Sequence, residues 1–262
     1  MSQRHPIATK PVVYRLQGMD DAIVRRDIEY KDRQIIDIYY PPGFCHDIPI
    51  PALLFVFAGS DAGAERILGC KFKEIESYIC WSRLAAASGI AAITYTNSDP
   101  AAGPFDVLAH IRRNAKTLMI DANRIAVWAC SGNVPLALSV VLEETPRCAV
   151  LCYGYLLDLG GSTIVADSMR KWGFVNPSAG KSVADLPRGV PLMIVRAGQD
   201  EMPGLNETMD RFVAEALHAN LNLTLVNHPA APHAFDIMDD SSQSQEIIRQ
   251  ILSFLRFHLF PR

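Results

Sequence analysis

The chain has 262 residues, 49% of them hydrophobic, and a formal net charge of −3 at pH 7. This length fits one large α/β domain with a sizeable core, and we expect a single domain over residues 1–262. The small, evenly spread charge argues against nucleic acid or an acidic membrane surface as a partner. No run approaches the roughly 20 apolar residues of a membrane span, and the polar amino terminus has no signal-peptide core, so we expect a cytoplasmic protein.

The six cysteines favour a reducing environment. They form no C-x-x-C pair, have no histidine at metal-ligand spacing, and stand at positions 45, 70, 80, 130, 148 and 152. Most lie inside apolar runs, where cysteine behaves as a small hydrophobe. We therefore expect buried free thiols, and neither a metal nor another cofactor.

Predicted strands and helices alternate along the chain. Two opening segments rich in β-branched and aromatic residues predict antiparallel strands at one side of a sheet, at residues 12–16 and 27–40. Further strands are predicted at 52–58, 90–95, 125–129, 148–153, 190–197 and 221–226, and residues 121–124 read as a turn before the third of these. Apolar stripes at helical spacing predict helices around 75–86, 107–118, 134–142, 205–217 and 247–259. This alternation is typical of a parallel sheet covered by helices on both faces.

The alternation of strands and helices stops at residues 157–187, which contain several glycines and prolines and show no clean hydrophobic periodicity. An irregular insertion of that length is usually functional or mobile, and here it would form a cap over the site. Trp172 and Phe174 are candidate walls of a substrate pocket. The competing interpretation is that both rings simply pack under a loop.

One stretch, residues 124–138, organises the chemistry. A buried strand leads through Cys130-Ser131-Gly132 directly into a helix. Such a turn exposes its residue at the carboxyl edge of the sheet, in front of the free N–H groups at the helix start. A serine nucleophile works well there, because its oxyanion meets a donor already in place. Pro135 fits, since a proline in the first helical turn removes no needed donor.

This stretch resembles the nucleophile elbow of the α/β-hydrolase superfamily, usually written G-x-S-x-G. Ala129 and Asn133 replace its two glycines. The resemblance implies a mostly parallel sheet of about eight strands with helices on both faces and a short cap insertion. It also implies that a catalytic acid and then a histidine follow the serine along the chain.

Asp200 and His233 stand in that order, each after a predicted strand, in segments 196–200 and 232–236 that look like those of dienelactone-hydrolase-like and carboxylesterase-like members. Parallel strand ends converge on one crevice, so residues far apart in sequence can meet there. Glu201 and Asp158 are alternative acids. His228 is an alternative base, although it follows the last strand too closely to reach across the sheet edge.

The resemblance also places an oxyanion hole. The loop after the strand at 52–58 begins Gly59-Ser60, where family members usually carry His-Gly. The backbone N–H groups of Ser60 and Gly132 are the candidate donors, because a main-chain donor needs no particular side chain. The alternative is that the glycines only turn the chain. Cys130 is a rival nucleophile, since dienelactone hydrolases use cysteine.

Two functions follow from these residues. The first is a serine hydrolase that cleaves a small-molecule carboxylic ester through Ser131, His233 and Asp200. The second is a hydrolase fold that has become a catalytically weak or inactive binding or regulatory protein, suggested by the missing elbow glycines and oxyanion-loop histidine. The sequence leaves the acyl group, the alcohol group and the oligomeric state open.

Overall fold

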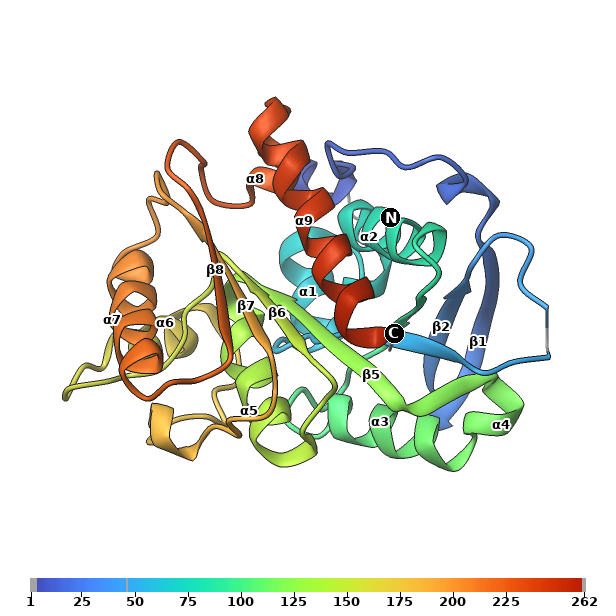
Figure 1. The fold of residues 1–262 in the computed structure, drawn as a ribbon, viewed down its shortest axis with the longest axis horizontal. Helices are drawn as coiled ribbons and strands as arrows, with labels where there is room; N and C mark the ends of the chain where they lie inside the picture. The colour runs from blue at the N-terminus through green and yellow to red at the C-terminus, as the bar shows by residue number, and fades with distance from the viewer. Residues whose placement is uncertain (1–3, 46, 261–262) are drawn as a thin grey trace.

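The computed structural model describes residues 4–45 and 47–260, and an eight-stranded sheet lies at its centre (Figure 1). The strands are ordered β1-β2-β4-β3-β5-β6-β7-β8 across the sheet. Their bounds are β1 Ile23–Lys31, β2 Gln34–Tyr40, β3 Ile50–Phe55, β4 Ala91–Tyr95, β5 Ile120–Cys130, β6 Ala149–Cys152, β7 Leu192–Ala197 and β8 Leu223–His228. β2 is antiparallel to β1 and β4, and the remaining pairs are parallel. The predicted mostly parallel sheet of about eight strands is confirmed.

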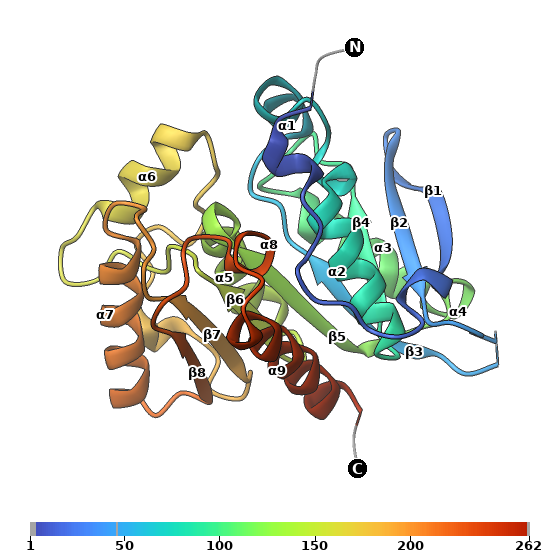
Figure 2. The ribbon, with the colours of Figure 1, turned by 90° about the horizontal axis from the view of Figure 1, so that it is seen from above.

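Helices cover both faces of the sheet. Their bounds are α1 Asp61–Leu68, α2 Glu76–Ala87, α3 Gly103–Arg113, α4 Ala115–Leu118, α5 Val134–Glu144, α6 Ile164–Trp172, α7 Leu205–His218, α8 Phe235–Met238 and α9 Ser242–Leu259. α2 and α9 pack on one face, and α3 and α5 pack on the other (Figures 1 and 2). Because both faces are covered, β4 and all of β3 after Ile50 are buried, which explains why these two strands read as mostly apolar runs. The edge strand β8 is mostly exposed, in line with its alternating sequence.

Four local predictions need correction. Residues 12–16 form no strand; they are an extended segment in which Val12 is buried and the Val13 N–H donates to the Asp236 carbonyl. The predicted strand at 27–40 is two strands, β1 and β2, joined by a turn at Asp32 and Arg33, which both have positive φ. The predicted turn at 121–124 belongs to β5, whose pairing with β3 begins at Ile120.

The fourth correction concerns residues 157–187, which include the helix α6. Only Val165 and Met169 of α6 are buried, so its apolar stripe is too short to stand out in the sequence. The carboxylate of Asp158 accepts hydrogen bonds from the N–H groups of Val165 and Ala166 and so caps this helix.

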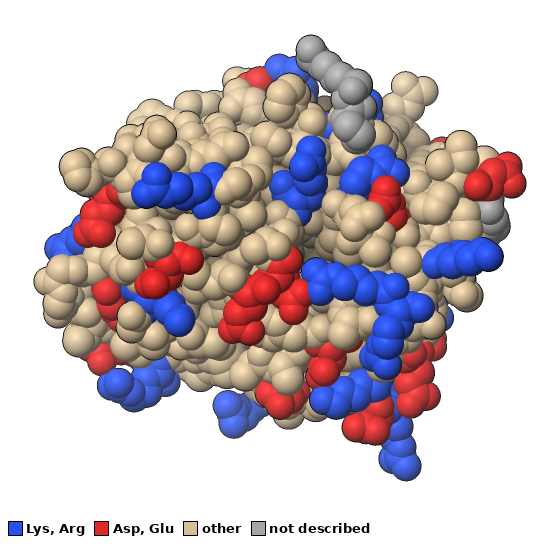
Figure 3. Space-filling view, turned by 60° about the horizontal axis from the view of Figure 1, so that its bottom comes forward, with Lys and Arg blue, Asp and Glu red and all other residues tan. Residues whose placement is uncertain are grey.

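Charged side chains of both signs are interspersed on the face that Figure 3 shows. Over residues 4–45 and 47–260, no helix combines the length and apolar character needed to cross a bilayer. The six cysteines are free thiols, four of them buried. Within those same residues, no three potential ligands among His, Cys, Asp and Glu gather into a metal site.

Candidate active site

Ser131 lies on a tight turn between β5 and α5. Its φ is +54°, a left-handed conformation that a non-glycine residue adopts only where the surroundings impose it. Gly154, just after β6, lets the neighbouring chain approach this turn: a Cβ there would lie 2.2 Å from Val134 Cγ2 and 2.7 Å from the Ser131 carbonyl oxygen. Pro135 occupies the first turn of α5, as the sequence predicts. The local backbone therefore presents Ser131 at the carboxyl edge of the sheet.

Ser131, His233 and Asp200 form a chain of two hydrogen bonds. Ser131 Oγ lies 2.9 Å from His233 Nε2, and His233 Nδ1 lies 2.6 Å from Asp200 Oδ2. The Asp200 side chain is fully buried. Because a carboxylate only accepts hydrogen bonds, it fixes the proton on Nδ1 and leaves Nε2 free to accept the serine proton. The three sequence candidates thus meet with the geometry that a general base requires.

Backbone hydrogen bonds hold the turn that carries Asp200 against the loop that carries His233. The N–H of Gly198 donates to the His228 carbonyl, and the N–H of Gln199 donates to the Ala231 carbonyl, both at 2.8 Å. The approach is so close that a Cβ at Gly198 would lie 2.3 Å from the Pro229 carbonyl oxygen. These contacts fix the spacing of acid and base independently of their side chains.

The rival residues do not take part in this chain of hydrogen bonds. His228 is buried, with its Nε2 bonded to Ser244 Oγ at 3.1 Å, and Asp158 caps α6. Glu201 is exposed. Cys130 Sγ lies 3.6 Å from the Tyr78 hydroxyl, and desolvation raises the pKa of this thiol to about 12. A thiol with such a pKa carries almost no thiolate at neutral pH and is a poor nucleophile.

A buried carboxylate next to the histidine loop was not singled out from the sequence. Asp236 accepts hydrogen bonds from the Tyr153 hydroxyl at 2.6 Å and from Trp81 Nε1 at 2.7 Å. Burial raises the pKa of Asp236, and these two donors act against that rise. The Tyr153 ring packs edge-on against the His233 ring, with centroids 5.3 Å apart. Asp236 therefore anchors the aromatic side chain that supports the imidazole.

The two candidate oxyanion donors, Ser60 and Gly132, both line the cavity that reaches Ser131. Ser60 caps α1, and its hydroxyl accepts the Gly63 N–H at 3.1 Å. Asn133, which replaces the second elbow glycine, accepts the N–H of Ala58 through its Oδ1 at 2.8 Å. The turn of Ser131 and the start of the loop that carries Ser60 are thus joined by a side chain that a glycine could not supply.

Asn97 holds the same loop from the opposite side. Its Nδ2 donates to the carbonyls of Phe57 at 2.8 Å and of Gly59 at 3.2 Å. Nothing in the sequence identified Asn97 or Asn133 in these roles, because each acts on a loop distant along the chain. Together they fix the backbone around Ser60.

Ser131 borders two cavities. The larger has a volume of about 390 Å³ and is lined by Trp172 and Phe174, the two predicted pocket residues. The Phe174 ring lies against Gly132, where a Cβ would come within 2.8 Å of it. The smaller cavity, of about 200 Å³, is lined by His233 and by aromatic side chains.

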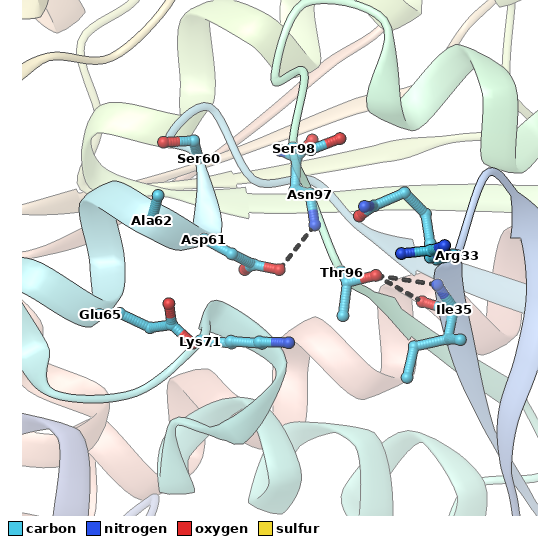
Figure 4. Close-up of a pocket in the computed structure, with 11 residues that line it drawn as sticks. Arg33, Ile35, Ser60, Asp61, Ala62, Glu65, Lys71, Thr96, Asn97 and Ser98 are labelled. Carbon is cyan, nitrogen blue, oxygen red and sulfur yellow. Dashed lines mark hydrogen bonds between the residues drawn. The ribbon is translucent and has the colours of Figure 1, made fainter. Parts of the chain in front are cut away.

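A third hollow, a groove of about 330 Å³, lies on the other side of Ser60 (Figure 4). It is polar: Arg33 and Lys71 stand on opposite sides of it, and the nearly buried carboxylate of Asp61 accepts the Asn97 N–H at 2.8 Å. Ser131 and His233 are not among the residues that line it.

No protein-family model matches this chain, and no curated protein sequence matches it. Several solved structures do match it in fold. A bacterial heroin esterase has a TM-score of 0.67 at 17% identity, with 93% of this chain and 86% of that one covered. A thermostable esterase from Pseudomonas putida has a TM-score of 0.68 at 14% identity, covering 93% and 85%. An α/β-hydrolase enzyme from the metagenome of Lake Arreo, solved as a Ser161Ala mutant, has a TM-score of 0.66 at 18% identity, covering 89% and 81%.

At this level of identity the shared property is the fold. The eight-stranded, mostly parallel sheet with helices on both faces, and the agreement with these structures over about nine tenths of the chain, define the class: this chain has the α/β-hydrolase fold.

Proposed function

We propose that this protein is a serine hydrolase that cleaves carboxylic esters of small molecules through Ser131, His233 and Asp200. The observation that carries the proposal is the pair of hydrogen bonds, 2.9 Å and 2.6 Å long, that joins the three side chains. The esterase names of the similar structures agree with it. We also propose that the chain is one domain with residues 157–187 as its cap. A cytoplasmic location would suit its free thiols.

The first half-reaction forms an acyl-enzyme. Ser131 Oγ attacks the ester carbonyl carbon while His233 Nε2 takes the hydroxyl proton. The backbone N–H groups of Gly132 and Ser60 stabilise the negative charge on the carbonyl oxygen. The tetrahedral intermediate then collapses: the bond to the alcohol oxygen breaks, and His233 gives its proton to that oxygen.

The second half-reaction releases the acid. His233 takes a proton from water while the water oxygen attacks the acyl carbon and forms a second tetrahedral intermediate. The bond between the acyl carbon and Ser131 Oγ then breaks, and His233 returns the proton to Oγ, which releases the acid and restores the serine hydroxyl. Asp200 keeps the imidazole oriented and stabilises its positive charge in both halves. Every proton in the cycle moves between Ser131, His233, the substrate and water.

The test combines turnover with covalent labelling. Wild-type protein should hydrolyse p-nitrophenyl acetate and react with a fluorophosphonate probe at Ser131, and Ser131→Ala should lower kcat by more than about ten-thousandfold and abolish labelling. Cys130→Ala is the matched control and should keep both properties. A label that maps to Cys130 would move the nucleophile. A folded wild type that reacts with no activated ester would favour the non-catalytic binding protein instead.

A further inference from the structure

Three large apolar side chains are exposed around the mouth of the 390 Å³ cavity. Ile7 is 37% exposed, Ile67 is 58% exposed and Trp172 is 48% exposed. All three line this cavity, although they come from separate elements: the short helix Pro6–Thr9, α1 and α6. In Figure 2 these elements stand at the same end of the molecule. Single exposed hydrophobic residues are ordinary, but three that converge on one opening mark a binding surface.

The cavity is apolar from this mouth to the catalytic serine. Its inner walls include Leu68, Phe72, Met169, Phe174 and Met202. The two methionines are flexible and adapt to ligands of different shape. The hydroxyl of Tyr155, which also lines the cavity, is already bonded to the Pro203 carbonyl at 3.1 Å. Among the described residues that line this cavity the charged one is Arg66, and it is exposed.

The position of the histidine decides which part of an ester enters the cavity. The departing alcohol oxygen has to take its proton from His233, which lines the smaller cavity. The carbonyl oxygen has to point to the amides of Gly132 and Ser60, which line the larger one. The alcohol therefore leaves on the side of the smaller cavity, and the acyl chain extends into the larger, apolar one.

From these observations we propose that the substrates are esters of apolar, medium-chain acids, whose acyl chain runs from Ser131 to Ile7, Ile67 and Trp172. This inference rests on the proposed ester hydrolysis, which it deepens by naming the acyl group. Each CH₂ that leaves water for the cavity should raise kcat/KM by up to about fourfold. The increase should stop at the length at which the chain passes the exposed rim.

The first experiment measures kcat/KM for p-nitrophenyl esters from acetate to dodecanoate. In the wild type we expect a rise of at least about a hundredfold from acetate to octanoate. Ile67→Ser and Trp172→Ala should lower the ratio of octanoate to acetate activity by about fivefold to tenfold each. Leu217→Ser is the matched control, because Leu217 is 60% exposed on α7 and does not line the cavity; its ratio should equal that of the wild type.

The second experiment does not depend on turnover. Trp172 is half-exposed at the rim, whereas Trp81 and Trp128 are 1% exposed and Trp128 lines the smaller cavity. The part of a tryptophan fluorescence change that Trp172→Phe removes therefore reports on the rim. Decanoate should shift the emission of the Ser131→Ala variant to shorter wavelength, acetate should not, and Trp172→Phe in that background should remove the shift.

The outcomes separate the two proposals. Acetate hydrolysis with a flat or falling chain-length profile, and no shift with decanoate, overturns the medium-chain inference and leaves the esterase intact. A decanoate-dependent shift without hydrolysis of any ester supports the apolar binding site and overturns the esterase.

Discussion

The 390 Å³ cavity and the 330 Å³ groove are similar in size and share one residue, Ser60, yet they differ in what their polar side chains do. In the cavity, the Ser131 hydroxyl faces His233 and is available to a substrate. In the groove, the Asp61 carboxylate accepts two backbone N–H groups, and the Thr96 hydroxyl is bonded to the backbone of Ile35 (Figure 4). The volume of a cavity alone therefore does not identify a candidate active site.

A residue of the groove nevertheless supports the cavity, because it holds the loop that the two share. Asn97, which lines the groove, donates hydrogen bonds to the carbonyls of Phe57 and Gly59 and so fixes the loop that carries Ser60. The comparison thus separates the residues that we propose to react with a substrate from residues whose hydrogen bonds hold the loop of Ser60 in place. Substitutions in the catalytic site should lower activity the most, whereas substitutions in the groove should have smaller effects on activity, and those of its buried residues should also change the free energy of unfolding.

The largest loss of activity should come from replacing Asp200, the proposed catalytic acid. Asp200→Asn would keep the side-chain shape but would allow the imidazole to take the wrong tautomer, so kcat for p-nitrophenyl butyrate should fall by about ten-thousandfold. Asp158→Asn is the matched control: it weakens the cap of α6 but should change kcat by less than about threefold. Equal losses in both variants would contradict the assignment of Asp200.

A smaller loss of activity should come from replacing Asn97, the groove residue that holds the loop of Ser60. Asn97→Ala removes both hydrogen bonds to the oxyanion loop, so kcat/KM should fall by about tenfold to a hundredfold. The free energy of unfolding should fall by about 1–3 kcal/mol, because two buried carbonyls lose their donor. Ester kinetics and urea unfolding measure the two effects, and Ser98→Ala, at an exposed neighbour, serves as the control. An unchanged kcat/KM would show that activity does not depend on the hydrogen bonds of Asn97 to this loop.

The sequence predicts the three residues of the proposed catalytic site, but not the residues whose side chains hold the surrounding loops. Ser131 stands between an apolar strand and a helix, and Asp200 and His233 follow predicted strands in the order that the resemblance to α/β-hydrolases implies, so the three could be proposed as neighbours from the sequence. Asn97 and Asp236 act through long-range contacts that have no local pattern; Trp81 and Asp236 are 155 residues apart. The same holds for residues 12–16, whose β-branched side chains favour a strand although the segment joins no sheet and bonds instead to the Asp236 carbonyl.

Asp61 should give a pH-dependent effect on stability. Burial raises the pKa of its carboxyl above the ordinary value of 3.8, so the folded protein ionises this group at higher pH than the unfolded chain does. The stability that the neutral form contributes is complete below pH 3.8 and is lost as pH rises through the raised pKa. The stability advantage of the wild type over Asp61→Asn should therefore be larger at pH 4 than at pH 7 in urea unfolding. An advantage that grows with pH would mean that the charged form is the favoured one.

The smallest effect is expected from the two cations of the groove. Over residues 4–45 and 47–260, neither the Arg33 guanidinium nor the Lys71 ammonium forms an ion pair, and neither residue lines a cavity that contains Ser131. The double variant Arg33→Gln and Lys71→Gln should keep kcat/KM for neutral esters within about twofold. It should also keep the free energy of unfolding within about 0.5 kcal/mol, as surface substitutions usually do. A tenfold loss of kcat/KM with an unchanged free energy of unfolding would mean that the groove takes part in ester hydrolysis.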